Sequence, residues 1–523
     1  MCKFLIACLL LPVAVSSALK EDKAYWATQT QIELDEALKL TRNENRAKNV
    51  ILFVGDGMGP NTITAARIFK GNGNEQTKLT FDEFPHIGLL KTYCADKQVP
   101  DSASTATALF CGVKGNYHTA GVDANVPEGD CQASQNPEYW VPSIIQWAQD
   151  AGKDTGFVTT TRVTHATPSA LYAHSPDRNW ECEAKLPSSA QGCKDIARQL
   201  IENEPGKNIK VIMGGGRQCL VSNATGDASD PLDIWACQSK DGRNLIKAWQ
   251  QDKQSRNFSS AYLKTNEDLW NVDVAKTDFV LGIFANGHLG YENEHIDRRP
   301  TGMPTLKNMT SVAIQLLKKN PKGFLLVVEG GLIDFAHHRG VAKHALYETV
   351  AMDDAIAAAL NLTTQDSDTL IIVTSDHSHG LSMTGYPKRG ADILGLAGTS
   401  KMDHTPYTTL SYTTGDNDSF KFSVTEEGTI VRDDPTKEAF SSFDYHQHTG
   451  ILTDEVLHGG SDVAVYAKGP MAHLFHSVHE QTYVAHVIAY AAKIGPYSSA
   501  SSFYSFSATA IVLFSFFVFY ILC

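Results

Sequence analysis

The sequence predicts a large α/β fold, in which a mostly parallel central sheet is sandwiched between helices. Short, continuous apolar runs recur along the chain and end in polar or glycine-rich residues, which is typical of strands covered on both faces. Segments with helical patterning, such as VPSIIQWAQDAG and ALYETVAMDDAIAAAL, lie between these runs. The expected strands begin, in chain order, at or near Asn49, Thr155, Ile209, Phe324, Thr369 and Asp462.

The segment from about Lys388 to Gln447 breaks this alternation, because it is rich in Thr, Gly, Asp and Tyr. Such turn-rich sequence differs from the buried strands around it, so we expect an inserted, crown-like subdomain here. The main α/β domain that contains it then spans residues 19–499.

The composition excludes two broad classes of protein. Of the 523 residues, 42% are hydrophobic and 20% are charged, a balance typical of globular rather than disordered chains. The chain has 45 Lys and Arg residues and 58 Asp and Glu residues, which gives a formal charge of −13. This acid excess argues against an extended nucleic-acid-binding surface. The acid excess and 19 histidines favour bound cations, which would supply the local positive charge of any phosphate pocket.

Both ends of the chain are predicted to be targeting signals. Residues 1–18 combine an early lysine, an apolar run and small residues near the cleavage position, which indicates a signal peptide and an extracytoplasmic protein. Residues 507–523 are nearly all apolar, but they are shorter than a usual spanning helix and lack a basic flank. With the small residues from Ser498 to Ser502, this tail favours a GPI-attachment signal with residues 500–523 as its propeptide. A short tail anchor is the alternative.

Cysteine usage agrees with secretion. Of ten cysteines, the seven outside the targeting segments form no CxxC pair, which favours disulfides or buried thiols over a zinc–thiolate site. Seven is an odd number, so at least one cysteine is free or pairs between chains. Sequons compatible with a glycosylated surface protein begin at Asn223, Asn257, Asn308, Asn361 and Asn417.

Polar and charged residues follow the expected strands directly. Ligands of open α/β sheets bind at the carboxyl ends of the strands, and several carboxylates converging there would repel one another unless cations lay between them. We therefore predict a site for more than one metal ion. The residues at these strand ends are Asp56, Thr164, His165, Glu329, Asp376 and His377.

Two further motifs contribute candidate ligands. Asp334 and His338 are four residues apart, which places a carboxylate and an imidazole on the same face of a helix. Taken alone, such a pair is more often an exposed helix contact, and DHSH or GDGMG alone would be ordinary turns. Their appearance at successive strand ends is what favours metal binding.

The segment PDSASTATALFCGVKG supplies a candidate nucleophile. Ser102 lies where a helix should begin, and the free N–H groups of a helix N-terminus favour a phosphate. The alternative is that Ser102 simply caps the helix. A neighbouring Zn²⁺ would favour the nucleophile, because it makes the hydroxyl far easier to deprotonate.

These motifs resemble, in order and spacing, those of the alkaline phosphatases. The matching segments are VGDGMG, PDSASTATA, TTRVTHATPSALYAHSPDRNW, VVEGGLIDFAHH, TSDHSHG and HGGSDVAVYAKGP, which extend from about Lys48 to Ile494. The two targeting signals resemble those of the GPI-anchored animal enzymes. The resemblance implies the alkaline phosphatase fold and hydrolysis of phosphate monoesters.

The resemblance also implies a role for individual residues. Ser102 matches the nucleophile that is transiently phosphorylated, Arg178 matches the arginine that grips the phosphate, and His165 would lie close to the magnesium or the phosphate. One zinc would be held by Asp334, His338 and His458. The other zinc would be held by Asp56, Asp376, His377 and the Ser102 oxygen. A magnesium ion would be held by Asp56, Thr167 and Glu329.

Several positions depart from the family pattern. Phe335 follows Asp334 where the animal enzymes commonly carry a histidine, and Ser104 replaces the usual glycine. Ala285 stands where a calcium-binding glutamate is usual, which makes a calcium site doubtful, and a C-terminal cysteine pair is absent. Among the cysteines, Cys131 and Cys193 match a disulfide of the family and Cys111 matches a free thiol, whereas no assignment follows for Cys94, Cys182, Cys219 and Cys237.

The sequence thus predicts a homodimeric metallophosphatase, held by a GPI anchor on the extracellular face of the cell membrane. Dimerisation follows from the resemblance alone, and nucleic acid is not expected as a partner. Two alternatives stay open: a sulfatase or phosphodiesterase with the same fold, and a catalytically silent surface-binding protein.

Overall fold

The computed structural model describes residues 21–295 and 302–498. The predicted signal peptide, residues 1–18, and the predicted propeptide, residues 500–523, lie outside these ranges. The chain divides into two units, Met1–Arg42 and Asn43–Cys523. In the first unit, helix α1 (Lys23–Leu38) begins where the Asp22 side chain accepts hydrogen bonds from the Ala24 and Tyr25 N–H groups. Within the described ranges, every helix is too short or too polar to cross a bilayer.

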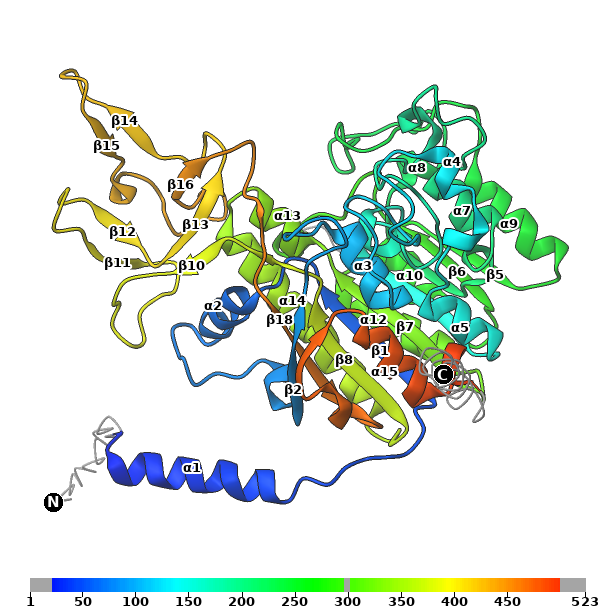
Figure 1. Ribbon diagram of the computed structural model, residues 1–523, viewed down its shortest axis with the longest axis horizontal. Coiled ribbons are helices and arrows are strands. Elements are labelled where there is room, and N and C mark those ends of the chain that lie inside the picture. The colour runs from blue at the N-terminus through cyan, green and yellow to red at the C-terminus, as the bar shows by residue number, and fades with distance from the viewer. Residues whose placement is uncertain (1–20, 296–301, 499–523) are drawn as a thin grey trace, which may run out of the picture. The chain divides into compact units, whose positions relative to one another are not determined.

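The second unit is built on a ten-stranded central sheet (Figure 1) in the order β19-β2-β18-β8-β1-β7-β3-β4-β6-β5. The seven strands from β8 to β5 are parallel, while β18 runs antiparallel to both of its neighbours. The mostly parallel sheet that the sequence predicts is therefore confirmed. The bounds are β1 (Asn49–Gly55), β2 (His86–Lys91), β3 (Asp154–Arg162), β4 (Val211–Gly215), β5 (Ser260–Leu263), β6 (Phe279–Ile283), β7 (Phe324–Gly330), β8 (Thr369–Ser375), β18 (Val463–Lys468) and β19 (Ser477–Glu480).

Sequence patterning identifies six of these strands and misses β2, β5, β6 and β19. Strands β5 and β19 have four residues each, too few for a periodic signal. Strand β2 alternates buried and exposed residues, unlike the continuous apolar runs of the inner strands. The missed strands lie toward the two edges of the sheet. Short length accounts for β5 and β19 and one-sided burial for β2, whereas β6 is fully buried and as long as β4, so neither reason applies to it.

Helices cover both faces of the sheet. In β1, Val50, Leu52 and Val54 pack into one apolar core, whereas Ile51 and Phe53 pack into the core on the other face. The continuous apolar runs follow from this two-sided burial.

The first core includes residues of α3 (Ser102–Cys111), α5 (Ile144–Asp150), α7 (Ile196–Glu202), α9 (Leu245–Ser255) and α15 (Tyr483–Ala492). The second includes residues of α2 (Pro60–Lys70), α10 (Asn266–Asn271), α12 (Leu306–Leu317), α13 (Leu332–His338) and α14 (Ala342–Thr363). The remaining helices are α4 (Cys131–Ser134), α6 (Ala166–Ser169), α8 (Arg217–Leu220) and α11 (Glu292–His295).

Small sheets occupy the segment that we expect to be inserted, and Figure 1 shows β11 to β16 gathered at one side of the central sheet. The bounds are β10 (Leu381–Met383), β11 (Leu396–Thr399), β12 (Pro406–Thr408), β13 (Leu410–Gly415), β14 (Phe422–Val424), β15 (Ile430–Arg432) and β16 (Thr449–Leu452). The boundaries of this subdomain, and of the main domain at residues 19–499, stay predictions. Two very short strands, β9 (Ser378–His379) and β17 (His458–Gly459), pair antiparallel and set His458 opposite His379.

Two disulfides form among the seven cysteines outside the targeting segments. Cys131 pairs with Cys193, as the resemblance implies, and Cys182 pairs with Cys237, a pairing for which the sequence offers no assignment. The free thiols in the described ranges are Cys94, Cys111 and Cys219, all of them buried.

Candidate active site

The carboxyl ends of three parallel strands, β1, β7 and β8, bring the predicted carboxylates together. The register pairs Gly55 of β1 with Gly330 of β7 on one side and with Ser375 of β8 on the other. Asp56 and Asp376 follow these strand ends directly, while Glu329 precedes Gly330. All three carboxylates are almost completely buried.

Ser102 is the first residue of α3, but it is not the residue that caps the helix. Asp101 is the N-cap, and its side chain accepts hydrogen bonds from the N–H groups of Ala103 and Ser104. The alternative that Ser102 acts only as a cap is therefore wrong. The Ser102 Oγ points instead into the site, 3.1 Å from His377 Nε2 and 3.4 Å from Asp56 Oδ1.

Asp334, His338 and His458 form the first candidate ligand set, with His379 beside them. The Nε2 atoms of His338 and His458 are 3.0 Å apart, and Asp334 carboxylate oxygens lie 3.3 and 3.4 Å from them. The Nδ1–H groups of the two rings donate to the carbonyls of Val456, at 2.9 Å, and Pro100, at 2.8 Å. Both Nε2 atoms then direct lone pairs at one another, a repulsion that only a proton or a metal cation relieves. This arrangement fits a metal ion.

His379 is a member of this cluster that the sequence analysis does not single out. Its Nε2 atom lies 2.5 Å from Asp334 Oδ1, so it orients that carboxylate. Burial lowers the pKa of His379 to about 3, which keeps the ring neutral. The signal is present in TSDHSHG, where the second histidine follows the first by two residues.

Asp56, Asp376 and His377 form the second candidate ligand set. The N–H of Gly57 and the hydroxyl of Thr105 hold Asp376, at 3.0 and 3.1 Å. Burial, followed by the carboxylates of Asp376 and Asp334, raises the pKa of Asp56 well above its ordinary value. Burial likewise raises the pKa of Asp376 to about 6. Such crowding of carboxylates is costly without cations, so this set fits a metal ion as well.

The third set joins Asp56 to Glu329, with His165 and Thr167 beside them. The Thr167 hydroxyl lies 3.4 Å from Asp56 Oδ2, and one nitrogen of His165 completes a cluster with Asp56 and Glu329. Glu329 Oε2 accepts a 2.5 Å hydrogen bond from Thr159, whereas Oε1 is buried with no partner among the described residues. An unpaired buried carboxylate oxygen fits a cation, and the oxygen-rich set suits Mg²⁺. Thr159, which anchors Glu329, is a supporting residue that the sequence analysis misses.

Arg178 lies beside these sets, held by Asp101 and next to His165. Its Nη1 donates to Asp101 Oδ2 at 3.2 Å, and its Nη2 lies 3.3 Å from His165 Nε2. Because Asp101 also caps α3, a single carboxylate positions both Arg178 and the Ser102 helix. A planar guanidinium in this position can bind two oxygens of a phosphate.

Phe335 lies on the side of the site rather than in the apolar layer beneath it. Its ring is partly exposed and lies 5.2 Å from the His288 ring, which in turn lies 5.1 Å from His165. The Arg339 guanidinium lies 4.7 Å from the centre of the Phe335 ring. Because Phe335 also directly follows the candidate ligand Asp334, we interpret it as a residue that borders the phosphate pocket.

Ala285 offers no side-chain ligand at the position of the doubtful calcium site. The carboxylate of nearby Asp230 forms a 2.5 Å ion pair with Arg217, whose N–H donates to the Ala285 carbonyl. A guanidinium thus neutralises that acid, and Asp230 belongs to none of the metal-ligand clusters found in the described ranges.

Comparison with known proteins gives consistent results. The family described as alkaline phosphatase matches residues 47–494. The tissue-nonspecific alkaline phosphatase of Rattus norvegicus is 47% identical over 485 residues, covering 91% of this chain and 90% of that protein. The isozyme of Homo sapiens is 46% identical over 499 residues, covering 92% of each chain. A membrane-bound alkaline phosphatase of Bombyx mori is 40% identical over 495 residues, covering 92% of this chain and 88% of that protein. A solved cold-active alkaline phosphatase of Shewanella superposes with a TM-score of 0.58 at 26% identity, covering 85% of this chain and 99% of that one.

Proposed function

We propose, from the premise that this chain belongs to the alkaline phosphatase family, that it hydrolyses phosphate monoesters through a phosphoserine intermediate on Ser102. Hydrolysis of monoesters is the activity of the family, and the chain is a phosphatase. The observation that carries the covalent route is the buried Ser102 Oγ, which lies within 3.4 Å of both His377 and Asp56, where the ligand sets meet.

The residues around Ser102 can bind a phosphate in line with this hydroxyl. Arg178 would hold two phosphate oxygens, and the N–H of Ser102 is left for a third because Asp101 takes those of Ala103 and Ser104. The Ser102 oxygen would attack phosphorus and form a P–O bond, while the ester P–O bond breaks and the alcohol leaves with a proton. Water would then cleave the phosphoserine, releasing inorganic phosphate and restoring the Ser102 hydroxyl.

The family implies metal cofactors, and the three ligand sets fit them. We assign Zn²⁺ to the set of Asp334, His338 and His458, because mixed imidazole and carboxylate ligands suit zinc. A second Zn²⁺ is assigned to Asp56, Asp376, His377 and Ser102. Mg²⁺ is assigned to Asp56, Thr167 and Glu329. When bound, these ions would supply Lewis acidity and neutralise the negative charge of the phosphate.

Comparing a monoester with a diester tests this function against its rivals. We expect p-nitrophenyl phosphate to be hydrolysed at least about a thousandfold faster than bis-p-nitrophenyl phosphate and p-nitrophenyl sulfate. The diester lacks one of the three free oxygens that Arg178 and the Ser102 N–H would bind, and the sulfate ester carries one negative charge fewer than the phosphate monoester. Preferred turnover of the diester or the sulfate would support the alternative enzyme. Turnover of none of the three by metal-loaded protein would support a silent surface protein.

We propose that a GPI anchor holds the mature protein on the outer face of the cell membrane. The small residues before the apolar tail support the anchor, and the name of the Bombyx mori relative supports membrane attachment alone. Phosphatidylinositol-specific phospholipase C is then expected to release active enzyme from membranes, because a lipid would have replaced the apolar tail. The measurement is activity in the supernatant after treatment. Activity that stays with the membrane, together with recovery of Cys523 in the C-terminal peptide, would establish the tail anchor instead.

We also retain the homodimer as a proposal, which the resemblance alone supports.

Replacing Phe335 with histidine is expected to tighten competitive inhibition by inorganic phosphate roughly tenfold, because histidine can donate a hydrogen bond to a charged group and phenylalanine cannot. Product release would slow, so kcat falls only if release limits turnover. The inhibition constant and the melting temperature should be measured together. Phe335→Leu is the matched control, since it removes the ring without adding a donor. An unchanged constant with a lowered melting temperature would refute a pocket role for this position.

A further inference from the structure

A basic pocket lies at the amino-terminal ends of central strands of the sheet, at the opposite end of these strands from the active site. Lys48 directly precedes β1, Lys153 directly precedes β3, and Lys322 lies two residues before β7. The active site begins at the other ends of these strands, and a seven-residue strand is roughly 20 Å long. The cavity has a volume of about 420 Å³ and is lined by Arg46, Lys48, Ala151, Lys153, Pro321 and Lys322.

The charge of this pocket contrasts with that of the whole chain. Four of its six lining residues are cations and none is an acid, although the formal charge of the protein is −13. Within the described ranges, none of the four cations forms an ion pair with a carboxylate. An unbalanced group of cations around a cavity attracts anions.

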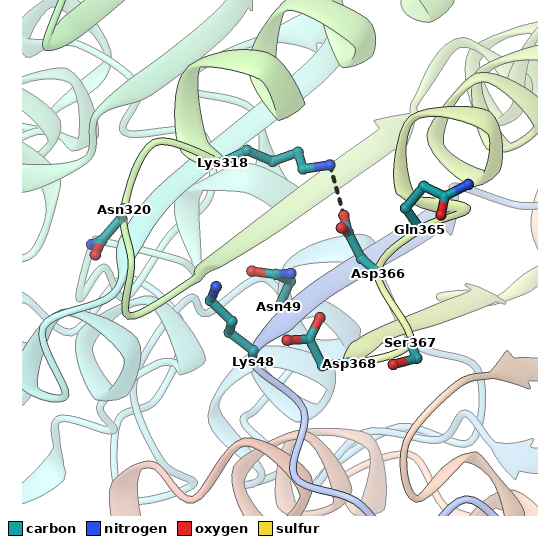
Figure 2. Close-up of a pocket in the computed structure, with 8 residues that line it drawn as sticks. All are labelled: Lys48, Asn49, Lys318, Asn320, Gln365, Asp366, Ser367 and Asp368. Atoms are coloured by element: carbon teal, nitrogen blue, oxygen red, sulfur yellow. Dashed lines mark ion pairs between the residues drawn. The ribbon is translucent and has the colours of Figure 1, made fainter.

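In an adjoining cavity at the same ends of the strands, a lysine is paired with a carboxylate. This cavity has a volume of about 180 Å³, shares Lys48 with the basic pocket, and contains Asp366 and Asp368 (Figure 2). There Lys318 forms a 2.7 Å ion pair with Asp366. No acid lines the basic pocket itself; Asp368 of the adjoining cavity offsets part of the Lys153 charge, and the remaining positive charge is available to a ligand.

Lys153 is the buried cation of the pocket. It is only 5% exposed, and its ammonium donates to the carbonyl oxygens of Lys48, at 2.6 Å, and Lys322, at 2.9 Å. An ammonium group has three N–H donors, so one remains for a ligand. Burial, followed by the Arg46 charge, lowers the pKa of Lys153 to about 8, a penalty that a bound anion would offset.

The pocket also lies beside the segment that leads to the predicted anchor. Arg46 Nε donates to the Ala492 carbonyl at 3.1 Å. Gly495 packs so closely on Trp147 that an added Cβ would lie 2.5 Å from the indole ring. Ala151, which lines the pocket, is one helical turn beyond Trp147. Ser498, the first candidate attachment residue, follows three residues after Gly495.

We propose that this pocket binds a phosphate group, and that the group is the phosphodiester of a membrane or anchor lipid. Four cations, a spare ammonium donor and the size of the cavity suit the charge and oxygens of a phosphate. The assignment of the phosphate group to a lipid rests on the anchor proposed above. The proposal that the pocket binds a phosphate group does not. Free inorganic phosphate presents the same chemistry and is the other source to be tested.

Calorimetric titration of the full-length, metal-loaded chain in detergent tests this site, with the chain expressed without lipid attachment so that no anchor phosphodiester already fills the pocket. One probe is glycerophosphoinositol, a phosphodiester that a monoesterase does not hydrolyse, and the other is inorganic phosphate, which also fills the active site. The variant Lys48→Gln/Lys322→Gln removes two exposed charges but keeps the carbonyls that hold Lys153. The matched control Lys388→Gln/Lys401→Gln removes the same charge from two exposed positions of the inserted segment.

We expect one glycerophosphoinositol to bind per chain, roughly tenfold more weakly in the pocket variant and unchanged in the control, without inhibiting p-nitrophenyl phosphate hydrolysis. Inorganic phosphate, but not glycerophosphoinositol, could instead bind at a second site that is lost in the pocket variant. That result would support a phosphate pocket whose ligand is free phosphate rather than a lipid phosphodiester. Equal binding of both probes by the pocket variant and the control would overturn the proposal. Hydrolysis and phospholipase release are measured separately, so failure of the proposed function or of the anchor is distinguishable from failure of the pocket.

Discussion

Replacing Ser102 with alanine is expected to lower phosphomonoesterase activity by roughly a thousandfold or more. The buried Oγ is the hydroxyl aimed at His377 and Asp56, and without it the phosphoryl group has no serine oxygen to bond to. The decisive measurement is ³²P trapped on the protein at acid pH, where less hydroxide is available to cleave the intermediate. We expect label on the wild-type protein and none on Ser102→Ala.

Ser104→Ala is the matched control for this experiment. It removes a serine hydroxyl from the same helical turn, one that hydrogen-bonds to Asp101 at 2.7 Å and not to the ligand sets. We expect this variant to keep its label and to lose no more than about tenfold in activity, the scale of one hydrogen bond to a charged group. Label that persists in Ser102→Ala would place the covalent bond on another residue.

Removing the metal ions is expected to abolish activity and to lower the melting temperature by several degrees, because buried carboxylates would then face one another without counter-ions. Asp56, Glu329, Asp334 and Asp376 are all at least nine-tenths buried. The measurements are hydrolysis, metal content and thermal unfolding before and after dialysis against a chelator, followed by addition of Zn²⁺ and Mg²⁺. Full activity in protein stripped of metal would contradict the assignment of the ligand sets.

A pair of histidine variants locates one of these ions. His338→Ala is expected to lower the zinc content from two per chain toward one, because His338 Nε2 faces His458 and Asp334. His337→Gln is the control, since the neighbouring ring hydrogen-bonds to Thr62 and Tyr412 instead. Equal zinc content in the two variants would show that His338 is not a ligand.

The candidate ligands at the strand ends could be identified from the sequence because their signals are local. Asp56 and Asp376 directly follow apolar runs, and the parallel arrangement of those runs places their carboxyl ends at one edge. The i,i+4 spacing of Asp334 and His338 likewise needs only the geometry of one helix. For the same reason the two helical segments VPSIIQWAQDAG and ALYETVAMDDAIAAAL could be assigned to α5 and α14 with no knowledge of their surroundings.

Other features depend on segments that are distant in the sequence, and only the tertiary structure decides them. The pairing of β9 with β17 sets His458 opposite His379, although 79 residues separate them, and two-residue strands carry no periodic signal. The cap of α3 is a local exception: Asp101 and Ser102 are adjacent polar residues, the sequence permits either as the cap, and the backbone at the helix start selects Asp101. The Cys182–Cys237 disulfide and the basic pocket at Lys48, Lys153 and Lys322 also arise from packing between separate elements. A chain specifies its helices, buried strands and strand-end residues through short-range periodicity, whereas contacts between loops form only when the packed core brings those loops together.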